Sequence, residues 1–451
     1  MYIHYTRSNA YAKTMRLYGA YRGAELISNP VHWVTMGEGE CGAECHYVGA
    51  KDTEELMTCL RLSDVRKVCW DASEVRAILF ATTGAVPDPR TFVDLSFFYR
   101  LLGLPCDTEP ATVDELKERH LAIRDQMQNL NIWRYVWEEC ERINSRGVAV
   151  RTTPDCDKTP MDRQTCADGR LRGGFRIMST KSGRATSSAL YSLPKGGSLR
   201  RRITGTNGNP LICADWSSME PRVMAYLLGV DWKLEAAKNG VDLYEELARR
   251  LSGVQDGSMT VTEERRTRAK ELDIMCGYGA GTKTVAKKLG IPYDNAEFLV
   301  KRWHELHPGV TQAVEELSRL LRSNRAKSDG ELALGSVTVR RSGDTLRVEL
   351  PSGRCLIYRD SDNDNDRRAT TVLQNIVSAF ATDLLYFALM RCDCLQCVVM
   401  HQYDEIVLDT GLTNRAPDWL RMYLEVIMTS TPRWANGLPL KVKIKTVDRY
   451  E

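Results

Sequence analysis

The chain has 451 residues, 43% of them hydrophobic and 27% charged, and its 62 basic and 59 acidic side chains give a net charge of +3. This length accommodates two or three domains. The chain shows no signal-like apolar run at its start, and no stretch approaches the ~20 apolar residues of a membrane span. We therefore expect a cytoplasmic protein with no membrane partner and with reduced thiols among its 14 cysteines. The balanced charge does not exclude nucleic acid, because basic clusters lie at 198–205 and 263–270.

The first part of the chain, residues 1–110, mixes short apolar runs with turn residues, which is typical of a small α/β unit. In chain order we expect a strand over 67–70, a helix over 73–84 and a strand or helix over 91–103. Residues 112–145 are strongly helical in pattern.

A polar stretch rich in Pro, Asp and Thr, residues 152–169, is the clearest predicted domain boundary. From about residue 170 one large domain is expected to continue to residue 451. The cysteines of "CDCLQC" (392–397) are interpreted as buried thiols rather than zinc ligands. A zinc site in the N-terminal region would use Cys41, Cys45 and Cys59.

The stretch "LICADWSSMEPR" places a carboxylate, Asp215, directly after the apolar residues 211–214, where a strand gives way to a helix. A carboxylate in a folded interior needs a hydrogen bond, an ion pair or a metal, because its desolvation is costly. One interpretation is a helix N-cap formed by Asp215 or Ser217. The other is a functional carboxylate, and this stretch alone leaves both open.

A second stretch, "EERRTRAKELDIMCGYG", repeats Arg266, Lys270, Ile274 and Tyr278 every four residues, which places them on nearly one helix face. Two cations followed by an aromatic ring fit a nucleoside triphosphate, which needs positive charge for its phosphates and a flat surface for its base. The alternative is an exposed basic face with Tyr278 packed into the core.

A third stretch, "CVVMHQYDEIVLDT" (397–410), predicts a β-hairpin with Asp404 and Glu405 at its tip. The simple alternative is turn chemistry, because Asp favours turns. If the strands that end at Asp215 and Asp404 are neighbours, the two carboxylates could hold a pair of divalent metals roughly 3.5–4 Å apart. Oxygen-only ligands favour Mg²⁺ or Mn²⁺ over zinc.

In this order the three stretches resemble motifs A, B and C of family A DNA polymerases, the DNA polymerase I class, and are most similar to its bacteriophage branch. The resemblance covers about residues 170–451. Motif A, usually D-Y-S-x-I-E-x-R, corresponds to residues 215–222, and motif C, usually H-D-E, to residues 403–405. Motif B, usually R-R-x-x-K-x-x-N-F-G-x-x-Y-G, is matched by Arg265, Arg266, Lys270, Tyr278 and Gly279.

The resemblance implies a role for each matched side chain at the reacting centre. Asp215 and Asp404 would be the catalytic carboxylates that bind two Mg²⁺ or Mn²⁺ ions, and Glu405 would assist them. The fingers helix would supply the dNTP-binding residues Arg266, Lys270, Ile274 and Tyr278.

The resemblance also implies contacts to the sugar and to DNA. Glu220 would crowd the 2′ position of the incoming nucleotide and so favour deoxynucleotides. The segment "TKSGRATSS" (180–188) resembles the family's T-G-R-x-S segment. Contacts to primer-template DNA are accordingly expected from Arg184, Tyr403, Asn375 and Ser378.

Four positions depart from the family pattern. Ile274 replaces an aromatic residue and Met275 a glycine, while Tyr403 stands where His is usual and Ser378 where Gln is usual. None of these changes removes an expected metal ligand, so reduced fidelity or altered nucleotide choice is the hypothesis they favour.

The expected fold is α/β in the α+β sense: a right-hand polymerase with an antiparallel-sheet palm and helical fingers, preceded by a small RNase H-like α/β domain. In the N-terminal domain, residues 68–80 and 92–103 resemble the H-N-x-x-F-D…V-D-T run of a 3′–5′ exonuclease. However, Trp70 and Asp71 occupy its H-N pair and Val75 stands where its metal-binding Asp belongs, which predicts an inactive, degenerate domain. The expected domains are 1–125 (exonuclease-like), 126–169 (linker and vestigial thumb) and 170–451 (polymerase, with palm 170–232 and 345–451 and fingers 233–344).

These observations predict a template-dependent DNA polymerase that extends a primer 3′-OH with dNTPs by a two-metal mechanism. Because a thumb and an intact exonuclease are missing from the pattern, accessory protein subunits are expected to supply processivity or proofreading. The alternatives are a non-catalytic replisome scaffold that retains the fold and a specialised end-adding or translesion polymerase.

Overall fold

The computed structural model describes most of the chain from residue 66 onward and three strands before it. The described residues are 2–7, 31–36, 44–47, 66–83, 87–104, 106, 108–128, 130–151, 159–253, 260–322, 329–363 and 368–451. Cys41 and Cys59 of the predicted zinc site lie outside them. The chain forms two compact units: the first comprises residues 1–215, 386–427 and 444–451, and the second comprises 216–385 and 428–443.

The N-terminal part of the first unit is a five-stranded sheet with the order β3-β2-β1-β4-β5. Its strands are β1 (Tyr2–Arg7), β2 (Val31–Met36), β3 (Glu44–Tyr47), β4 (Lys67–Cys69) and β5 (Phe92–Asp94). β1 is antiparallel to β2 and parallel to β4, and β4 is parallel to β5. This mixed order agrees with the RNase H-like α/β domain that the sequence predicts.

Two acidic residues that follow or end β4 and β5 accept hydrogen bonds from the first turns of the helices α3 (Ala72–Thr83) and α4 (Leu95–Leu102). Asp71 accepts a hydrogen bond from the backbone N–H of Glu74, at 3.1 Å. Asp94 is the N-cap of α4 and also accepts the N–H of Ala72, at 3.1 Å. Burial and then the charge of Asp71 raise the pKa of Asp94 to about 7. Both carboxylates are thus engaged in helix capping.

Two long helices follow, as the helical pattern predicts: α5 (Val113–Gln128) and α6 (Asn131–Arg146). A buried ion pair between Arg76 and Glu141, at 2.6 Å, joins α3 to α6. A three-stranded sheet of order β7-β6-β8 comes next. Its strands are β6 (Val148–Val150), β7 (Arg170–Leu171) and β8 (Ile203–Thr204), and the five-residue helix α7 (Pro160–Gln164) lies between β6 and β7 in the chain.

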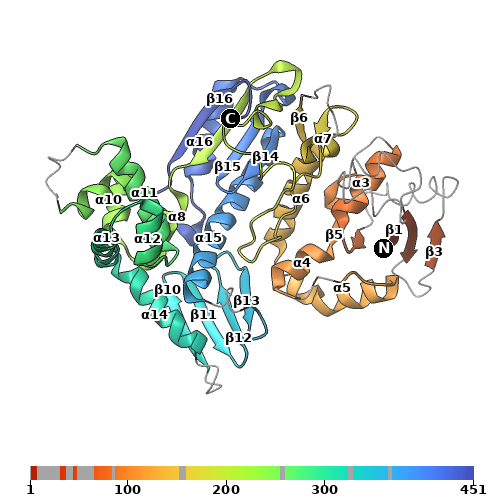
Figure 1. Ribbon diagram of the computed structural model, residues 1–451. Helices are drawn as coiled ribbons and strands as arrows, with labels where there is room; N and C mark the ends of the chain where they lie inside the picture. The colour runs from red at the N-terminus through yellow and green to blue at the C-terminus, as the bar shows by residue number, and fades with distance from the viewer. Residues whose placement is uncertain are drawn as a thin grey trace. The chain divides into compact units, whose positions relative to one another are not determined.

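The sheet that carries Asp215 and Glu405 has the order β14-β15-β9-β16 (Figure 1). Its strands are β14 (Val398–Gln402), β15 (Glu405–Asp409), β9 (Leu211–Trp216) and β16 (Val442–Val447). β15 pairs antiparallel with both β14 and β9. Residues 211–214 and 406–408 are apolar and buried, so the centre of the sheet is apolar. The helix α16 (Pro417–Thr429) follows β15.

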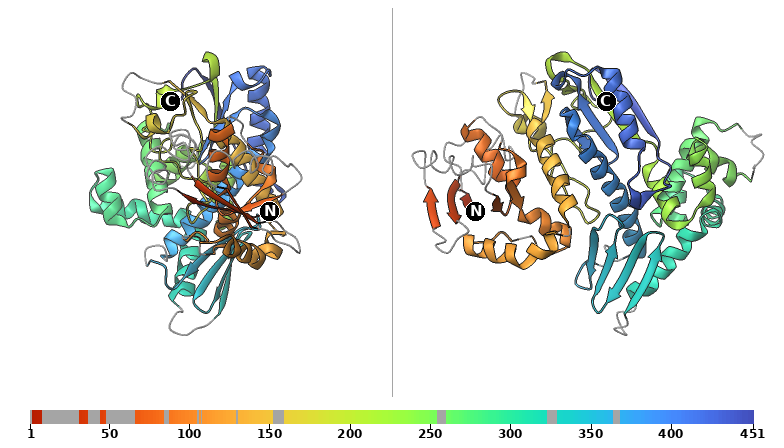
Figure 2. Two further views of the ribbon diagram at one scale, coloured as in Figure 1. Left: turned by 90° about the vertical axis from the view of Figure 1, so that its right-hand side faces the viewer. Right: turned by 180° about the vertical axis from the view of Figure 1, so that it is seen from behind.

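The second unit is mainly helical, with one four-stranded antiparallel sheet of order β10-β11-β12-β13. The elements of this unit are α8 (Met219–Leu228), α9 (Asp231–Lys238), α10 (Leu243–Leu251), α11 (Glu263–Gly277), α12 (Thr282–Leu289), α13 (Tyr293–Leu306), α14 (Pro308–Arg322), β10 (Gly330–Leu334), β11 (Val337–Ser342), β12 (Thr345–Glu349) and β13 (Cys355–Arg359). Helix α14 lies beside the sheet (Figure 2, right).

The boundary between the units falls within the long helix α15 (Ala369–Arg391). This helix is long and apolar enough to cross a membrane by length and composition, so the expectation that no stretch approaches a membrane span was wrong. Its apolar window is 83% buried inside the protein. A helix that is apolar on all sides and buried in this way is a core helix.

Candidate active site

The first site carboxylate, Asp215, lies near the end of β9, and its cross-strand partner in β15 is Glu405. Asp215 is exposed, whereas the four residues before it are buried. The N-cap position of α8 is occupied by Ser218, with φ of 53°, so neither Asp215 nor Ser217 caps this helix. The capping interpretation of Asp215 was therefore wrong, because the strand extends past it to Trp216.

The second site carboxylate, Asp404, lies in the two-residue turn that joins β14 to β15, as the hairpin prediction states. Tyr403, the other turn residue, has φ of 53°, which a two-residue hairpin requires but a tyrosine rarely adopts. The Arg184 guanidinium lies 5.1 Å from the centre of the Tyr403 ring. The centres of the Tyr191 and Tyr403 rings are 5.5 Å apart. Arg184 and Tyr403, both expected to bind DNA, are thus brought together beside Asp404.

The carboxyl groups of Asp215 and Asp404 interact directly. Burial, then the charge of Asp215 and a hydrogen bond between the two groups, raise the pKa of Asp404 to about 7. Two ionised carboxylates this close repel one another, and a divalent cation between them would remove the repulsion. The oxygen-only donor set fits Mg²⁺ or Mn²⁺. Over the part of the chain that the structure describes, no group of three or more His, Cys, Asp or Glu side chains is arranged to hold a metal.

Glu405 is held by two residues that the sequence did not single out. The Tyr450 hydroxyl donates a hydrogen bond to its Oε2, and the Arg200 guanidinium lies 3.8 Å from the same oxygen. Burial raises the pKa of Glu405 despite the hydrogen bond from Tyr450, which lowers it. Arg200 lies in a basic cluster noted in the sequence, whereas no sequence pattern marks Tyr450.

In the second unit, the predicted cationic face lies on α11, whose first turn is capped by Thr262. Arg266 donates hydrogen bonds to Asp242, at 2.9 Å, and to Glu263, at 3.3 Å. Arg266 and Lys270 lie 5.7 and 5.9 Å from the centre of the Tyr244 ring, so both cations flank one aromatic side chain. Neither Asp242 nor Tyr244 was predicted from the sequence.

The end of the same helix meets the predicted sugar-selecting residue. α11 ends at Gly277, so Tyr278 is its C-cap rather than its last turn, and Ile274 is 40% exposed. The Tyr278 hydroxyl donates to Glu220, and the Ser378 hydroxyl of α15 donates to the other oxygen of Glu220, at 3.2 Å. Asn375 lies on α15 about one turn before Ser378. The structure therefore brings Tyr278, Glu220 and Ser378 into one cluster.

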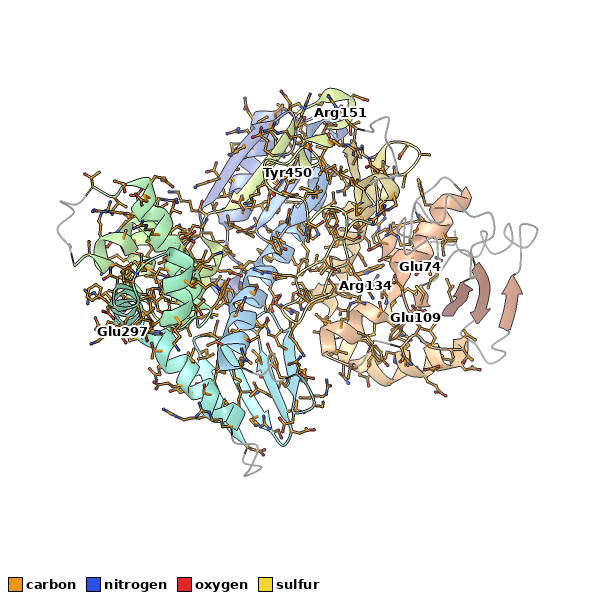
Figure 3. The ribbon with its side chains drawn as sticks, viewed as in Figure 1. Glu74, Glu109, Arg134, Arg151, Glu297 and Tyr450 are labelled. Atoms are coloured by element: carbon orange, nitrogen blue, oxygen red, sulfur yellow. The ribbon has the colours of Figure 1, made fainter. Side chains whose placement is uncertain are left out.

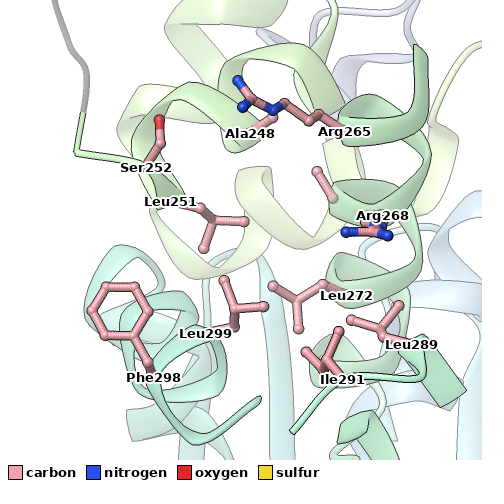
Figure 4. Close-up of a pocket in the computed structure, with 11 residues that line it drawn as sticks. Ala248, Leu251, Ser252, Arg265, Arg268, Leu272, Leu289, Ile291, Phe298 and Leu299 are labelled. Carbon is pink, nitrogen blue, oxygen red and sulfur yellow. The ribbon is translucent and has the colours of Figure 1, made fainter. Parts of the chain in front are cut away.

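A separate cavity of about 490 Å³ lies between α10, α11, α12 and α13 (Figure 4). Its α11 residues include Arg265, Arg268 and Leu272, which occupy a different helix face from Arg266 and Lys270. Most of its lining is aliphatic or aromatic, including Leu251, Leu289, Ile291, Phe298 and Leu299. An apolar lining does not suit a triphosphate, so this cavity is distinct from the cationic face.

The fold, with its helices and antiparallel sheets, is similar to that of a solved polymerase domain. The polymerase domain of Pol1 from M. smegmatis, in complex with a DNA primer-template and dNTP, matches 93% of this chain and 92% of its own length. The TM-score is 0.64 and the sequence identity 16%, so the likeness shows the mixed helical and antiparallel-sheet fold that the sequence predicted.

Sequence comparison shows which proteins the chain is similar to. The profile of DNA polymerase family A matches residues 151–329. The DNA polymerase of Bacillus phage SP02 is 28% identical over 282 residues, which cover 56% of this chain and 43% of the phage protein. The thermostable DNA polymerase I of Thermus aquaticus is 29% identical over 287 residues, which cover 61% of this chain and 32% of that enzyme. These matches span less than half of each relative's length. Over this part of its length the chain is similar to DNA polymerase family A.

Proposed function

We propose that this protein is a template-dependent DNA polymerase that extends a primer 3′-OH with dNTPs. The observation that carries the proposal is the meeting of Asp215 and Asp404 from two adjacent antiparallel strands. Two ionised carboxylates side by side repel one another without a cation, so a structural role alone gives no reason to keep the pair. The non-catalytic scaffold alternative does not require this pair.

Asp215 and Asp404 would hold the divalent cations, Mg²⁺ or Mn²⁺. When bound, such ions lower the pKa of the attacking 3′ oxygen and stabilise charge on the transferred phosphoryl group. The backbone pairing of β9 with β15 along five residues fixes the positions of the two carboxylates. Preorganised charge of this kind supplies much of the catalysis in phosphoryl transfer.

Arg266 and Lys270 would bind the triphosphate. In the structure Arg266 is occupied by Asp242 and Glu263, so a triphosphate would take over these ion pairs. Guanidinium groups bind phosphate oxygens in bidentate geometry, which favours the exchange. Glu220, held by Tyr278 and Ser378, would restrict the sugar 2′ position, and Arg184 with Tyr403 would contact the primer-template.

We further propose that partner subunits supply processivity and proofreading. Among the described residues, α7 is the only helix between α6 and β7, and it has five residues, which leaves little for a thumb. Asp71 and Asp94 are engaged as helix caps, and Val75 is fully buried, which supports the interpretation of an inactive exonuclease-like domain. Fewer phosphate contacts should shorten the residence time on duplex DNA.

The test is template-directed incorporation by the purified chain. Four primer-templates that differ only in the first templating base are each offered single dNTPs with Mg²⁺. The proposal expects incorporation of the complementary dNTP on each template. Addition of the same dNTP on all four templates would favour an end-adding enzyme instead. A lack of incorporation by the chain, with recovery on adding an extract of its source, would support the partner requirement.

A further inference from the structure

The carboxylate of Glu405, which lies beside the other two site carboxylates, is contacted by two further side chains. The Tyr450 hydroxyl donates to its Oε2, and Arg200 lies 3.8 Å from the same oxygen. The Arg200 guanidinium carbon also lies 4.0 Å from the centre of the Tyr450 ring, in a cation–π contact. The three side chains therefore form a closed triangle of contacts, which we name the Glu405 clamp: Arg200, Glu405 and Tyr450.

The clamp is buried and fixed from several sides. Tyr450 is 1% exposed and Arg200 5%. The backbone N–H of Tyr450 donates to the Ile203 carbonyl at 3.0 Å, and its hydroxyl also contacts Gln402 Oε1 at 3.3 Å. Figure 3 labels Tyr450 in the region of the sheet that carries Glu405. A buried tyrosine held at its backbone and at its hydroxyl has little freedom to release Glu405.

The position of Glu405 in the sequence would otherwise make it a third ligand. It directly follows Asp404 and is the cross-strand partner of Asp215. Nevertheless these three side chains do not form a three-ligand metal group within the described residues. Mg²⁺ in phosphoryl-transfer sites is usually held by one or two protein carboxylates, with substrate phosphates and water in the other positions. A third carboxylate would occupy a position that the substrate needs.

We propose that Arg200 and Tyr450 are positioning residues that hold the Glu405 carboxylate away from the cation-binding pair, Asp215 and Asp404. This inference rests on the proposed function only in taking that pair as the cation site. The clamp keeps the protein ligand set at two carboxylates and leaves coordination positions for the nucleotide and the primer.

The experiment measures Mn²⁺ binding to the full chain without DNA or dNTP. The concentration of free Mn²⁺ is determined by electron paramagnetic resonance. Tyr450→Phe keeps the buried ring and removes the hydroxyl that holds Glu405. We expect this variant to bind Mn²⁺ more tightly, by about three- to tenfold, because a third carboxylate becomes available. In a Glu405→Gln background the same Tyr450→Phe substitution should leave Mn²⁺ affinity unchanged.

The matched control is Tyr386→Phe, which removes another buried tyrosine hydroxyl, one that donates to the Gly183 carbonyl at 2.8 Å. It should not change Mn²⁺ affinity. Arg200→Lys gives a second test of the clamp and should act in the same direction as Tyr450→Phe. An affinity that is unchanged or lower in Tyr450→Phe, or an effect that persists with Glu405→Gln, would overturn the inference.

Measuring Mn²⁺ binding and dNTP incorporation on the same variants distinguishes failure of the clamp inference from failure of the proposed polymerase function. If the expected pattern of Mn²⁺ binding is found in a chain that does not incorporate dNTPs on any template, the clamp stands and the proposed polymerase function fails. If Asp404→Asn leaves Mn²⁺ binding unchanged, the pair is not the cation site and the clamp inference is overturned even if the chain polymerises DNA.

Discussion

A buried ion pair anchors the cationic helix α11 to its neighbours, and removing its cation is the perturbation we develop first. Lys233 of α9 donates to both oxygens of Asp273 on α11, at 2.7 and 2.8 Å. Their side chains are 2% and 4% exposed. Trp303 of α13 donates to the same carboxylate at 2.8 Å. Burial alone would raise the pKa of Asp273, but the charge of Lys233 makes the net change a lowering.

Lys233→Met keeps the length of the side chain and removes its charge, so Asp273 is left as a buried carboxylate without its cation. Breaking such a pair destabilises a protein by about 3–5 kcal/mol. For a unit of this size each kcal/mol lowers the midpoint of thermal unfolding by about 2–4 °C, which gives a decrease of about 6–20 °C. Urea denaturation at pH 7, followed by circular dichroism, measures the change in the free energy of unfolding.

The matched control is an exposed ion pair on the same helix. Arg268 lies 2.9 Å from Glu264, and the two side chains are 57% and 73% exposed. Arg268→Met should change the free energy of unfolding by less than about 1 kcal/mol, because solvent screens such pairs. The double variant Lys233→Met/Asp273→Asn should recover part of the loss, since the buried charge is gone. If Lys233→Met costs no more than Arg268→Met, the reasoning from burial is refuted.

Two further predictions concern the same unit. Burial, then the charge of Lys233, lower the pKa of His307 to about 3, whereas an unfolded histidine has a pKa of about 6.5. As the pH falls, the unfolded state therefore takes up a proton first, and the free energy of unfolding decreases between about pH 6.5 and pH 3. His307→Gln should weaken this dependence of the free energy of unfolding on pH, measured by urea titrations at several pH values. An unchanged dependence would contradict the assignment to His307. Ser378→Ala removes one of the hydrogen bonds to Glu220. The ratio of kcat/KM for dATP to kcat/KM for ATP should fall about fivefold, which corresponds to a loss of about 1 kcal/mol. If Glu220→Ala lowers this ratio but Ser378→Ala leaves it unchanged, the role of Ser378 is contradicted.

Much of the first site could be predicted from the sequence, because its parts are local patterns. An apolar run that ends in Asp215, and a hairpin with Asp404 at its tip, each follow from strand and turn signals, and the family resemblance indicates that the two strands are neighbours. The structure pairs them in register. The cationic face of α11 follows from helical periodicity in the same way.

The residues that hold the site could not be predicted, because their contacts join distant parts of the chain. Tyr450 contacts Glu405 from 45 residues further along the chain and Arg200 from the other side of β9 in the chain, and neither belongs to a motif that was recognised. Lys233 and Asp273 are residue types that usually lie on the surface, so only the structure shows that they are buried and paired. The apolar character of α15 was misjudged for a related reason: serine and threonine interrupt its apolar pattern, yet its apolar window is mostly buried.

The measurement that tests the central claim most directly is primer extension with Mg²⁺ and all four dNTPs by the wild-type chain, Asp404→Asn and Asp418→Asn. Asp418 is an exposed acidic residue in the first turn of α16 and serves as the control for loss of one carboxylate. We predict extension by the wild type and by Asp418→Asn, and a loss of at least about 100-fold in Asp404→Asn, because a group that stabilises the transition state directly is removed. Extension by Asp404→Asn at the wild-type rate would contradict the assignment of Asp215 and Asp404 as the catalytic pair.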